Sequence, residues 1–271
     1  MTVLQFEGGQ SNPTFMIENN GRKYVMRKKP PGKLLKSAHP IDREYRVMAV
    51  LQNSDVPVPE TYLLCENESV IGTAFNLMEC VAGRVISDPK LEKLASGEQR
   101  KLYDDSIAVM AALHMINCDA AGLGDFGRSG NYLACQIPRR SIQYVAPQTG
   151  DVEAMDKLME WLPANTPESN EVAIVHGDFR IGNFLVHPTE PKISALLDWE
   201  LSTLGHPLAD LAYFVYYSNR AHDDGREPNI PAEEEIVSAY CERTGQAKIE
   251  DWTFYMVFNH VSLRRYRSRP R

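Results

Sequence analysis

The sequence predicts an α+β protein with two lobes, a small β-rich N-terminal lobe that contains one helix and a larger, mainly helical C-terminal lobe. Residues 1–80 carry short runs of β-branched and aromatic residues separated by Gly, Asn and Pro, which is typical of strands. After Gly83 the pattern becomes helical. A length of 271 residues also favours two lobes over one. We therefore expect one lobe at 1–80 and the other at 81–271.

Four strands and one helix are expected in the first lobe. The runs VLQFEGG, TFMIEN, KYVMRK and TAFNLMEC predict strands, and the NNG sequence at 19–21 predicts a hairpin between two of them. The stretch HPIDREYRVMAVLQ predicts a helix because Ile41, Tyr45 and Met48 recur at helical spacing. The prolines of VPVPE at 56–60 then indicate an extended linker.

The second lobe is predicted to be helical, with a short insertion of strands. Ser96 and Gln99 fit a capping box at the start of a helix that runs to about Ile116. Further along, EVAIV and FLV predict short strands on either side of the loop HGDFRIGN. The sequence PTEP then turns the chain, and KISALLD predicts a strand that returns it.

Composition excludes several classes of protein. The net charge of −7 disfavours a general nucleic-acid binder and a binder of anionic membranes. The five cysteines are scattered and form no C-x-x-C pair, which argues for a reducing compartment and against a structural zinc site. No secretory signal is visible, and no apolar run reaches the roughly 20 residues of a membrane span. These features predict a cytoplasmic protein.

The stretch VHGDFRIGNFLVHPTEPKISALLDWE carries the candidate chemistry. Strands paired in a hairpin would bring Asp178, Asn183 and Asp198 to one end of the pair. Asp and Asn oxygens are hard ligands that suit Mg²⁺ with water and phosphate, and a second carboxylate can accept a proton from an incoming hydroxyl. That division of roles is typical of phosphoryl transfer. A metal-dependent hydrolase that uses His176 and His187 is the alternative, although such sites usually contain more clustered ligands.

The spacing of these residues is similar to that in known families of kinases. Asn183 follows Asp178 by five positions, as in the catalytic loop of protein kinases, but this chain has HGD and DWE where those enzymes have HRD and DFG. The pattern IVHGDFRIGN…LLDWELSTLGHPLADLAY resembles the aminoglycoside phosphotransferase and choline kinase family, which has a protein-kinase-like fold. The closest resemblance is to kinase-like domains associated with acyl-CoA dehydrogenases, and it extends from about residue 4 to 258.

The resemblance implies a role for each matching residue. Asp178 would be the catalytic base, Asn183 and Asp198 would bind the metal, and Asp210 would brace the catalytic loop. The nucleotide would be bound by Gly9, Ser11, Asn12, Arg27, Glu44, Met78, Glu79 and Val81. Within this set, Glu44 would pair with Arg27, and Lys28 and Lys29 stay open as alternatives to Arg27 for the phosphate contact.

These features predict a phosphotransferase that uses ATP and Mg²⁺ to phosphorylate a hydroxyl of a small molecule. The alternative is a catalytically silent kinase-like module that binds nucleotide. Residues 22–46 contain nine basic side chains and two acidic ones, a net charge of +7. One interpretation is a solvated basic loop that assists only with the ATP phosphates; the other is that its lysines also attract a polyanionic acceptor such as a hydroxyacyl-CoA. The resemblance further implies a functional link to an acyl-CoA dehydrogenase. The net charge and the lack of a long apolar run predict neither nucleic acid nor a membrane as a partner.

Overall fold

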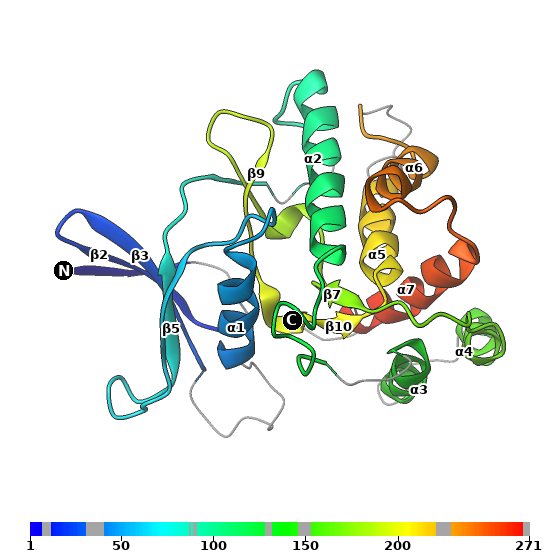
Figure 1. The fold of residues 1–271 in the computed structure, drawn as a ribbon, viewed down its shortest axis with the longest axis horizontal. Helices are drawn as coiled ribbons and strands as arrows, with labels where there is room; N and C mark the ends of the chain where they lie inside the picture. The colour runs from blue at the N-terminus through cyan, green and yellow to red at the C-terminus, as the bar shows by residue number, and fades with distance from the viewer. Residues whose placement is uncertain are drawn as a thin grey trace. The chain divides into compact units, whose positions relative to one another are not determined.

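The fold is that of an α+β protein with a β-sheet lobe that includes a helix and a helical lobe, as predicted (Figure 1). It is seen in a computed structural model that describes residues 1–6, 12–30, 41–86, 88, 91–127, 132–145, 153–220 and 229–267. By their contacts the residues form two compact units, which are treated separately below. The first comprises Met1–Ser87 with Ile181–Ser202, and the second comprises Asp88–Arg180 with Thr203–Arg271.

A five-stranded antiparallel sheet forms the centre of the first unit. In spatial order its strands are β1 (Thr2–Gln5), β2 (Thr14–Asn19), β3 (Arg22–Lys28), β5 (Phe75–Glu79) and β4 (Thr61–Cys65). The predicted hairpin joins β2 to β3, where Asn20 and Gly21 take φ values of 52° and 76°. A turn with positive φ at both central residues matches the twist of the strands, which explains the Asn-Gly pair.

Strand β4 was not predicted. Its sequence TYLLC follows two prolines and has a strand-like composition, but it lacks a clean alternation of apolar and polar residues. Strand β4 forms because it pairs with β5 at the edge of the sheet. Pairing with a strand from another part of the chain can outweigh a weak local sequence pattern.

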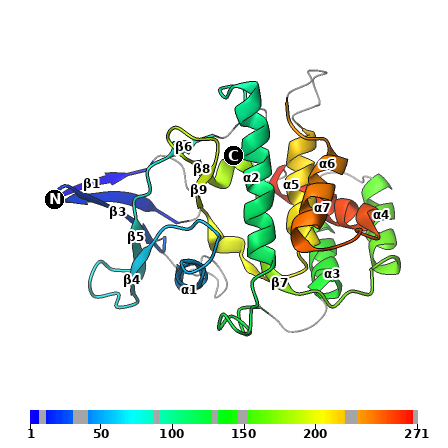
Figure 2. The ribbon, with the colours of Figure 1, turned by 45° about the horizontal axis from the view of Figure 1, so that its top comes forward.

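Helix α1 (Ile41–Leu51) packs against β4 and β5 of this sheet, and Figure 2 shows it beside them. Its apolar positions Ile41, Val47, Met48 and Leu51 are fully buried, in agreement with the helical spacing in the sequence. Glu44 is buried on the same helix, which is costly for a carboxylate unless it has a partner.

A second, three-stranded sheet belongs to the same unit. Strand β8 (Phe184–Val186) lies between β6 (Arg84–Val85) and β9 (Ile193–Leu196), so the hairpin predicted around the PTEP turn is present. Gly83 precedes β6 at a point where a Cβ would collide with the Leu185 side chain. The pairing of β6 with β8 explains why residues 181–202 group with the first unit; the division of the chain into domains at residue 80 stays a prediction.

The second unit consists of helices around a small two-stranded sheet. Strand β7 (Ala173–Val175) pairs with β10 (Thr203–Gly205). The helices are α2 (Ser96–His114), α3 (Tyr132–Val145), α4 (Glu153–Ala164), α5 (Leu208–Asn219), α6 (Glu233–Thr244) and α7 (Trp252–Arg267). Helix α5 packs against α6 and α7, and α2 packs against α6 and β7 (Figure 1). Their shared core is aromatic: Tyr103, Phe126, Phe179, Phe214, Tyr240, Phe254 and Phe258 are almost completely buried.

The start of α2 differs from the predicted capping box by one residue. The backbone N–H of Ala95 donates to Glu98 Oε2 at 3.1 Å, while the Gln99 side chain donates to the Leu91 carbonyl. The reciprocal bond of a capping box is thus made by Glu98, because it is three residues from the true N-cap. In the described part of the chain, no helix combines the length and the apolarity that crossing a membrane requires.

Candidate active site

The loop after β7 carries Asp178, the predicted base. Its backbone is held by Asp210 of α5, which accepts hydrogen bonds from the N–H of His176 at 2.6 Å and of Gly177 at 2.9 Å. Gly177 takes a φ of 83°, a left-handed conformation that favours glycine. Asp210 is buried, so both bonds are charge-assisted and shielded from water. The predicted bracing of the loop by Asp210 is confirmed.

The Asp178 carboxylate lies between two donors of the second unit. The Tyr213 hydroxyl on α5 donates to Oδ1, and Arg180 Nε donates to Oδ1 and Oδ2 at 3.1 and 3.2 Å. Burial and the Asp178 charge both raise the pKa of Tyr213, so the phenol remains a donor at neutral pH. These hydrogen bonds fix the orientation of the Asp178 carboxylate, whose side chain is 16% exposed.

Sequence reasoning missed both Arg180 and Tyr213. Arg180 lies two positions after Asp178, and a basic residue so close to a candidate base is a usable signal. Tyr213 could have been found only through α5, because it follows Asp210 by three positions and therefore lies on the same helix face.

The predicted metal ligands lie together in the first unit. Asn183 ends the 3₁₀ turn η1 (Ile181–Asn183) just before β8, and Asp198 follows β9 by two positions. The N–H of Leu197 donates to the Asn183 carbonyl at 2.9 Å, so both residues are at the same end of the β8–β9 hairpin. Asp198 has φ 68° and ψ 56°, a left-handed conformation that Asp tolerates better than most residues.

The residues at this end of the hairpin suit Mg²⁺ that is also bound by water and phosphate, but they are too few to coordinate a metal ion by themselves. Asp198 and Asn183 offer two hard oxygen ligands, and Mg²⁺ usually keeps several positions for water and phosphate. Among the described residues there is no cluster of three or more His, Cys, Asp or Glu side chains that could hold a metal. His187 Nδ1 accepts the N–H of Glu190 at 3.1 Å within a turn, so the hydrolase alternative lacks its ligand set.

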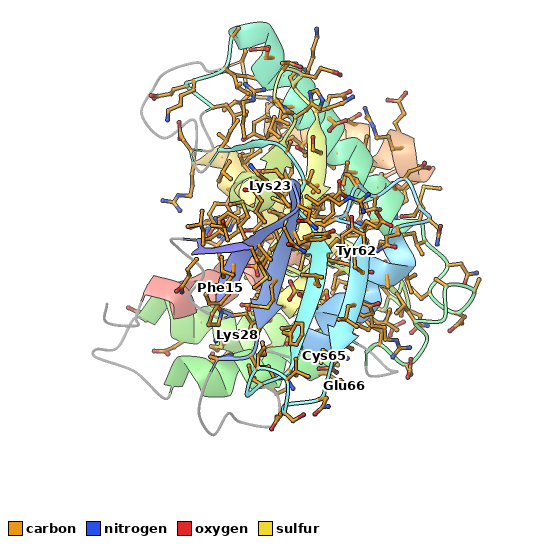
Figure 3. The ribbon with its side chains drawn as sticks, turned by 90° about the vertical axis from the view of Figure 1, so that its left-hand side faces the viewer. Phe15, Lys23, Lys28, Tyr62, Cys65 and Glu66 are labelled. Carbon is orange, nitrogen blue, oxygen red and sulfur yellow. The ribbon has the colours of Figure 1, made fainter. Side chains whose placement is uncertain are left out.

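Arg27 of β3 connects Glu44 of α1 to Asp198. Its Nη1 pairs with Glu44 Oε1, as predicted, and its Nη2 contacts Asp198 Oδ1 at 3.2 Å. Lys28 is on the opposite face of the strand, with Nζ 5.3 Å from the centre of the Phe15 ring, and Figure 3 shows the two side by side. Strand alternation therefore favours Arg27 over Lys28 for the predicted phosphate contact, whereas Lys29, just beyond the end of β3, stays an alternative.

Glu44 has an unusual electrostatic environment. Burial raises its pKa to about 7, and the carboxylates of Asp198 and Glu200 act in the same direction, while Arg27 only partly compensates. The pKa of Arg27 is raised, because Glu44 and Asp198 outweigh the opposite effect of its burial. Arg27 therefore stays charged at every relevant pH, whereas Glu44 titrates near neutrality.

A pH-dependent stability follows from this raised pKa. The folded state binds the Glu44 proton more tightly than the unfolded state, so the contribution is fully present below pH 4.5 and is lost as pH rises through about 7. Urea unfolding should show that the stability of the wild type relative to Glu44→Gln falls by about 3 kcal/mol between pH 4.5 and pH 8. Glu153→Gln, a change at an exposed carboxylate of α4, is the control and should leave the pH dependence unchanged. A difference that stays constant across this pH range would contradict the assignment.

The predicted nucleotide-binding residues are only partly described. Gly9 and Ser11 lie outside the described residues. Asn12 and Asn76 are buried, and their amide atoms have no hydrogen-bond partner among the described residues. Asn76 is the register partner of Arg27 across β5 and β3, so its unused donors and acceptors belong to the strand position beside Arg27. Buried polar atoms normally find partners, and a bound polar group would supply them here.

The remaining predicted residues of this set lie at the end of β5 or just beyond it. Met78 is buried, Glu79 is partly exposed and accepts the N–H of Glu60 at 3.3 Å, and Val81 is partly exposed. Met78 and Glu79 are paired with β3, and the Glu79 N–H donates to the Glu60 carbonyl at 2.8 Å, whereas Val81 lies beyond the strand.

Comparison with known proteins decides the family. The sequence profile of the family described as "Phosphotransferase enzyme family" matches residues 2–254. This chain belongs to that family.

Several curated relatives of this phosphotransferase family member are much longer proteins. It is 41% identical over 96% of its length to Acyl-CoA dehydrogenase family member 10 of Mus musculus, and it covers 25% of that protein. It is 38% identical over 97% of its length to Acyl-CoA dehydrogenase family member 11 of Homo sapiens, of which it covers 35%. The chain thus spans a quarter to a third of the length of these relatives, and the resemblance stated from the sequence is confirmed.

Solved structures confirm the fold of this family member. A Ralstonia eutropha protein that is provisionally classed as an aminoglycoside phosphotransferase matches with a TM-score of 0.89 and 43% identity, over 98% of this chain and 82% of that one. A thermostable mutant of aminoglycoside phosphotransferase APH(4)-Ia, in a ternary complex with AMP-PNP and hygromycin B, has a TM-score of 0.64 and 18% identity. That match covers 98% of this chain and 86% of the other. The predicted protein-kinase-like fold is therefore correct.

Proposed function

We propose that this chain is an ATP- and Mg²⁺-dependent small-molecule kinase that phosphorylates a hydroxyl group. The observation that carries the proposal is the setting of Asp178, a carboxylate that Tyr213 and Arg180 orient by hydrogen bonds on a loop whose backbone N–H groups are bound by Asp210. A charged carboxylate on a rigid loop is suited to accept a hydroxyl proton. Membership of the phosphotransferase family supports the same reaction.

In the proposed reaction the acceptor oxygen forms a bond to the γ-phosphorus of ATP while the bond to the β–γ bridging oxygen breaks. Asp178 orients the hydroxyl and takes its proton, and ADP leaves with the electron pair. Asn183 and Asp198 would hold Mg²⁺, which supplies charge neutralisation at the phosphates when bound. Arg27, fixed by Glu44, would bind phosphate oxygens with its planar guanidinium.

The other nucleotide contacts are proposed on the family pattern. The loop with Gly9, Ser11 and Asn12 would cover the phosphates with backbone N–H groups. Met78, Glu79 and Val81 would offer main-chain groups to the adenine. The unpartnered amide of buried Asn12 is consistent with a polar ligand at that position.

For the acceptor we propose a hydroxyacyl thioester of coenzyme A. Residues 22–46 carry a net charge of +7 in a chain whose total is −7, and such a segment attracts polyanions and repels polycationic aminoglycosides. Two of its lysines, Lys33 and Lys36, lie outside the described residues. The relatives named for acyl-CoA dehydrogenases support a functional link to acyl-CoA metabolism.

The test is ATP consumption by the purified chain with a panel of acceptors. Hydroxyacyl-CoA esters should be phosphorylated, and kcat/KM should fall about tenfold between low and physiological salt because the attraction is electrostatic. Aminoglycosides and choline should be inert. Turnover of those compounds without any turnover of the CoA esters at low salt would refute this acceptor. Thermal stabilisation by Mg²⁺–ATP with no turnover of any acceptor would favour the silent nucleotide-binding module instead.

A further inference from the structure

Two guanidinium groups lie against one tyrosine of α5, next to the candidate base. Tyr217 follows Tyr213 by one helical turn, and their ring centres are 5.0 Å apart. The Cζ atoms of Arg180 and Arg220 are 5.9 and 5.8 Å from the centre of the Tyr217 ring, within the range of cation–π contacts. The ring thus brings the guanidinium groups of Arg180 and Arg220, which come from separate parts of the second unit, into one cluster beside Asp178.

Arg180 uses only part of its hydrogen-bonding capacity. It binds Asp178 through Nε, while Nη1 and Nη2 have no acceptor within hydrogen-bonding distance in the part of the chain that the structure describes. A guanidinium has five N–H donors, so four remain for another partner. The two terminal nitrogens form the edge that binds a carboxylate or a phosphate with two parallel hydrogen bonds. Arg180 can therefore hold Asp178 and a second anion at the same time.

Arg220 has no carboxylate partner among the described residues, and it is exposed just after the end of α5. Glu233 of α6 is engaged elsewhere, since its oxygens accept from Asn219 Nδ2 at 2.8 Å and from Trp252 Nε1 at 2.7 Å. The aromatic contact holds the Arg220 guanidinium without neutralising its charge. By formal count Arg180, Arg220 and Asp178 together carry one net positive charge, so the cluster attracts anions.

We propose that Arg180 and Arg220, supported by Tyr217, form a subsite for an anionic group of the acceptor, either a carboxylate or a phosphate. The identification of the ligand as the acceptor rests on the proposed kinase function. The anion subsite itself does not, because all its residues belong to the second unit. It lies on α5 and the catalytic loop, apart in sequence from the basic segment 22–46. The subsite favours acceptors that carry an anionic group and disfavours cationic ones.

Calorimetric titration of the full chain tests the subsite without any turnover. Three ligands are titrated separately in the presence of excess ADP. Coenzyme A tests binding of a phosphate, 4-hydroxybutyrate tests binding of a carboxylate, and pantetheine is the neutral control. Arg220→Gln should weaken binding of whichever anionic probe occupies the subsite by about tenfold, because one charged hydrogen-bonding partner is lost. Pantetheine binding should not change. The matched control is Arg100→Gln, which removes an exposed arginine of α2 that pairs with Glu235.

Two further measurements test the subsite and the proposed kinase activity independently. With a turnover assay, Arg220→Gln should raise the KM of an anionic acceptor about tenfold while kcat and the KM of ATP stay unchanged. Tyr217→Phe should behave as wild type because the ring remains, and Tyr217→Leu should resemble Arg220→Gln. Arg220-dependent anion binding without ATP consumption would support the subsite and refute the kinase. Equal anion affinities in Arg220→Gln, Arg100→Gln and the wild type would overturn the subsite, whatever the enzyme does.

Discussion

Replacing Asp178 with Asn should lower the rate of phosphoryl transfer at least about 100-fold while Mg²⁺–ATP affinity stays nearly unchanged. The substitution keeps the size of the side chain and an oxygen that can accept from Tyr213 or Arg180, so the loop should retain its geometry. It removes the charge and the proton acceptor, and these are the two properties that the proposed mechanism needs. Single-turnover kinetics with a hydroxyacyl-CoA measure the chemical step, and calorimetry measures the nucleotide affinity.

Asp104→Asn is the matched control for this substitution. Asp104 is an exposed carboxylate of α2 that pairs with Arg243, and its loss should leave turnover within about twofold, since exposed ion pairs contribute little. Near-normal turnover in Asp178→Asn would show that another group accepts the proton.

Replacing Asp198 with Ala should abolish Mg²⁺-dependent nucleotide binding, because the metal would lose its only charged ligand at the end of the β8–β9 hairpin. The expected result in calorimetry is no detectable Mg²⁺–ATP affinity, against a clear signal for the wild type. The same change releases Arg27 from its contact at 3.2 Å, leaving the buried Arg27–Glu44 pair intact.

The left-handed backbone at residue 198 requires a second variant. Alanine in this conformation costs roughly 1–2 kcal/mol, so thermal unfolding must confirm that Asp198→Ala is folded. Asp198→Asn tolerates the conformation and keeps one oxygen ligand, and it should bind Mg²⁺–ATP with intermediate affinity. Unaltered affinity in both variants would exclude Asp198 as a ligand.

The sequence predicted the parts of the candidate site that depend on local spacing. The loop with Asp178, the turn at Asn183 and the strand that leads to Asp198 lie within 21 consecutive residues, and short motifs preserve such distances. The Arg27–Glu44 pair was also predicted, but only through the family resemblance, since 17 positions separate the two residues.

The parts that were missed depend on tertiary packing. β7 and β8 flank the catalytic loop and were expected to bring its residues to one end of a shared pair. Instead β7 pairs with β10, and β8 pairs with β6 in addition to β9, its partner in the predicted hairpin; β10 and β6 lie elsewhere in the chain, so local sequence could not indicate them. Tyr213 and Arg220 could not be assigned from composition, since an aromatic residue on an apolar helix and an exposed arginine are both common in any protein.

The clamp formed by Asp210 has a consequence for how this loop can vary. Asp210 binds the backbone N–H groups of residues 176 and 177 and touches neither side chain through these bonds. Every residue except proline has such an N–H, so the clamp does not depend on which side chains the loop displays. The Asp210 bonds therefore place no restriction on the loop side chains beyond a positive φ at position 177, although buried His176, whose Nδ1 accepts the Asp178 N–H at 3.2 Å, and buried Phe179 are fixed by other contacts. The scaffold and the chemistry of the loop are in this sense separable, and one helix carboxylate can support catalytic loops of different specificity.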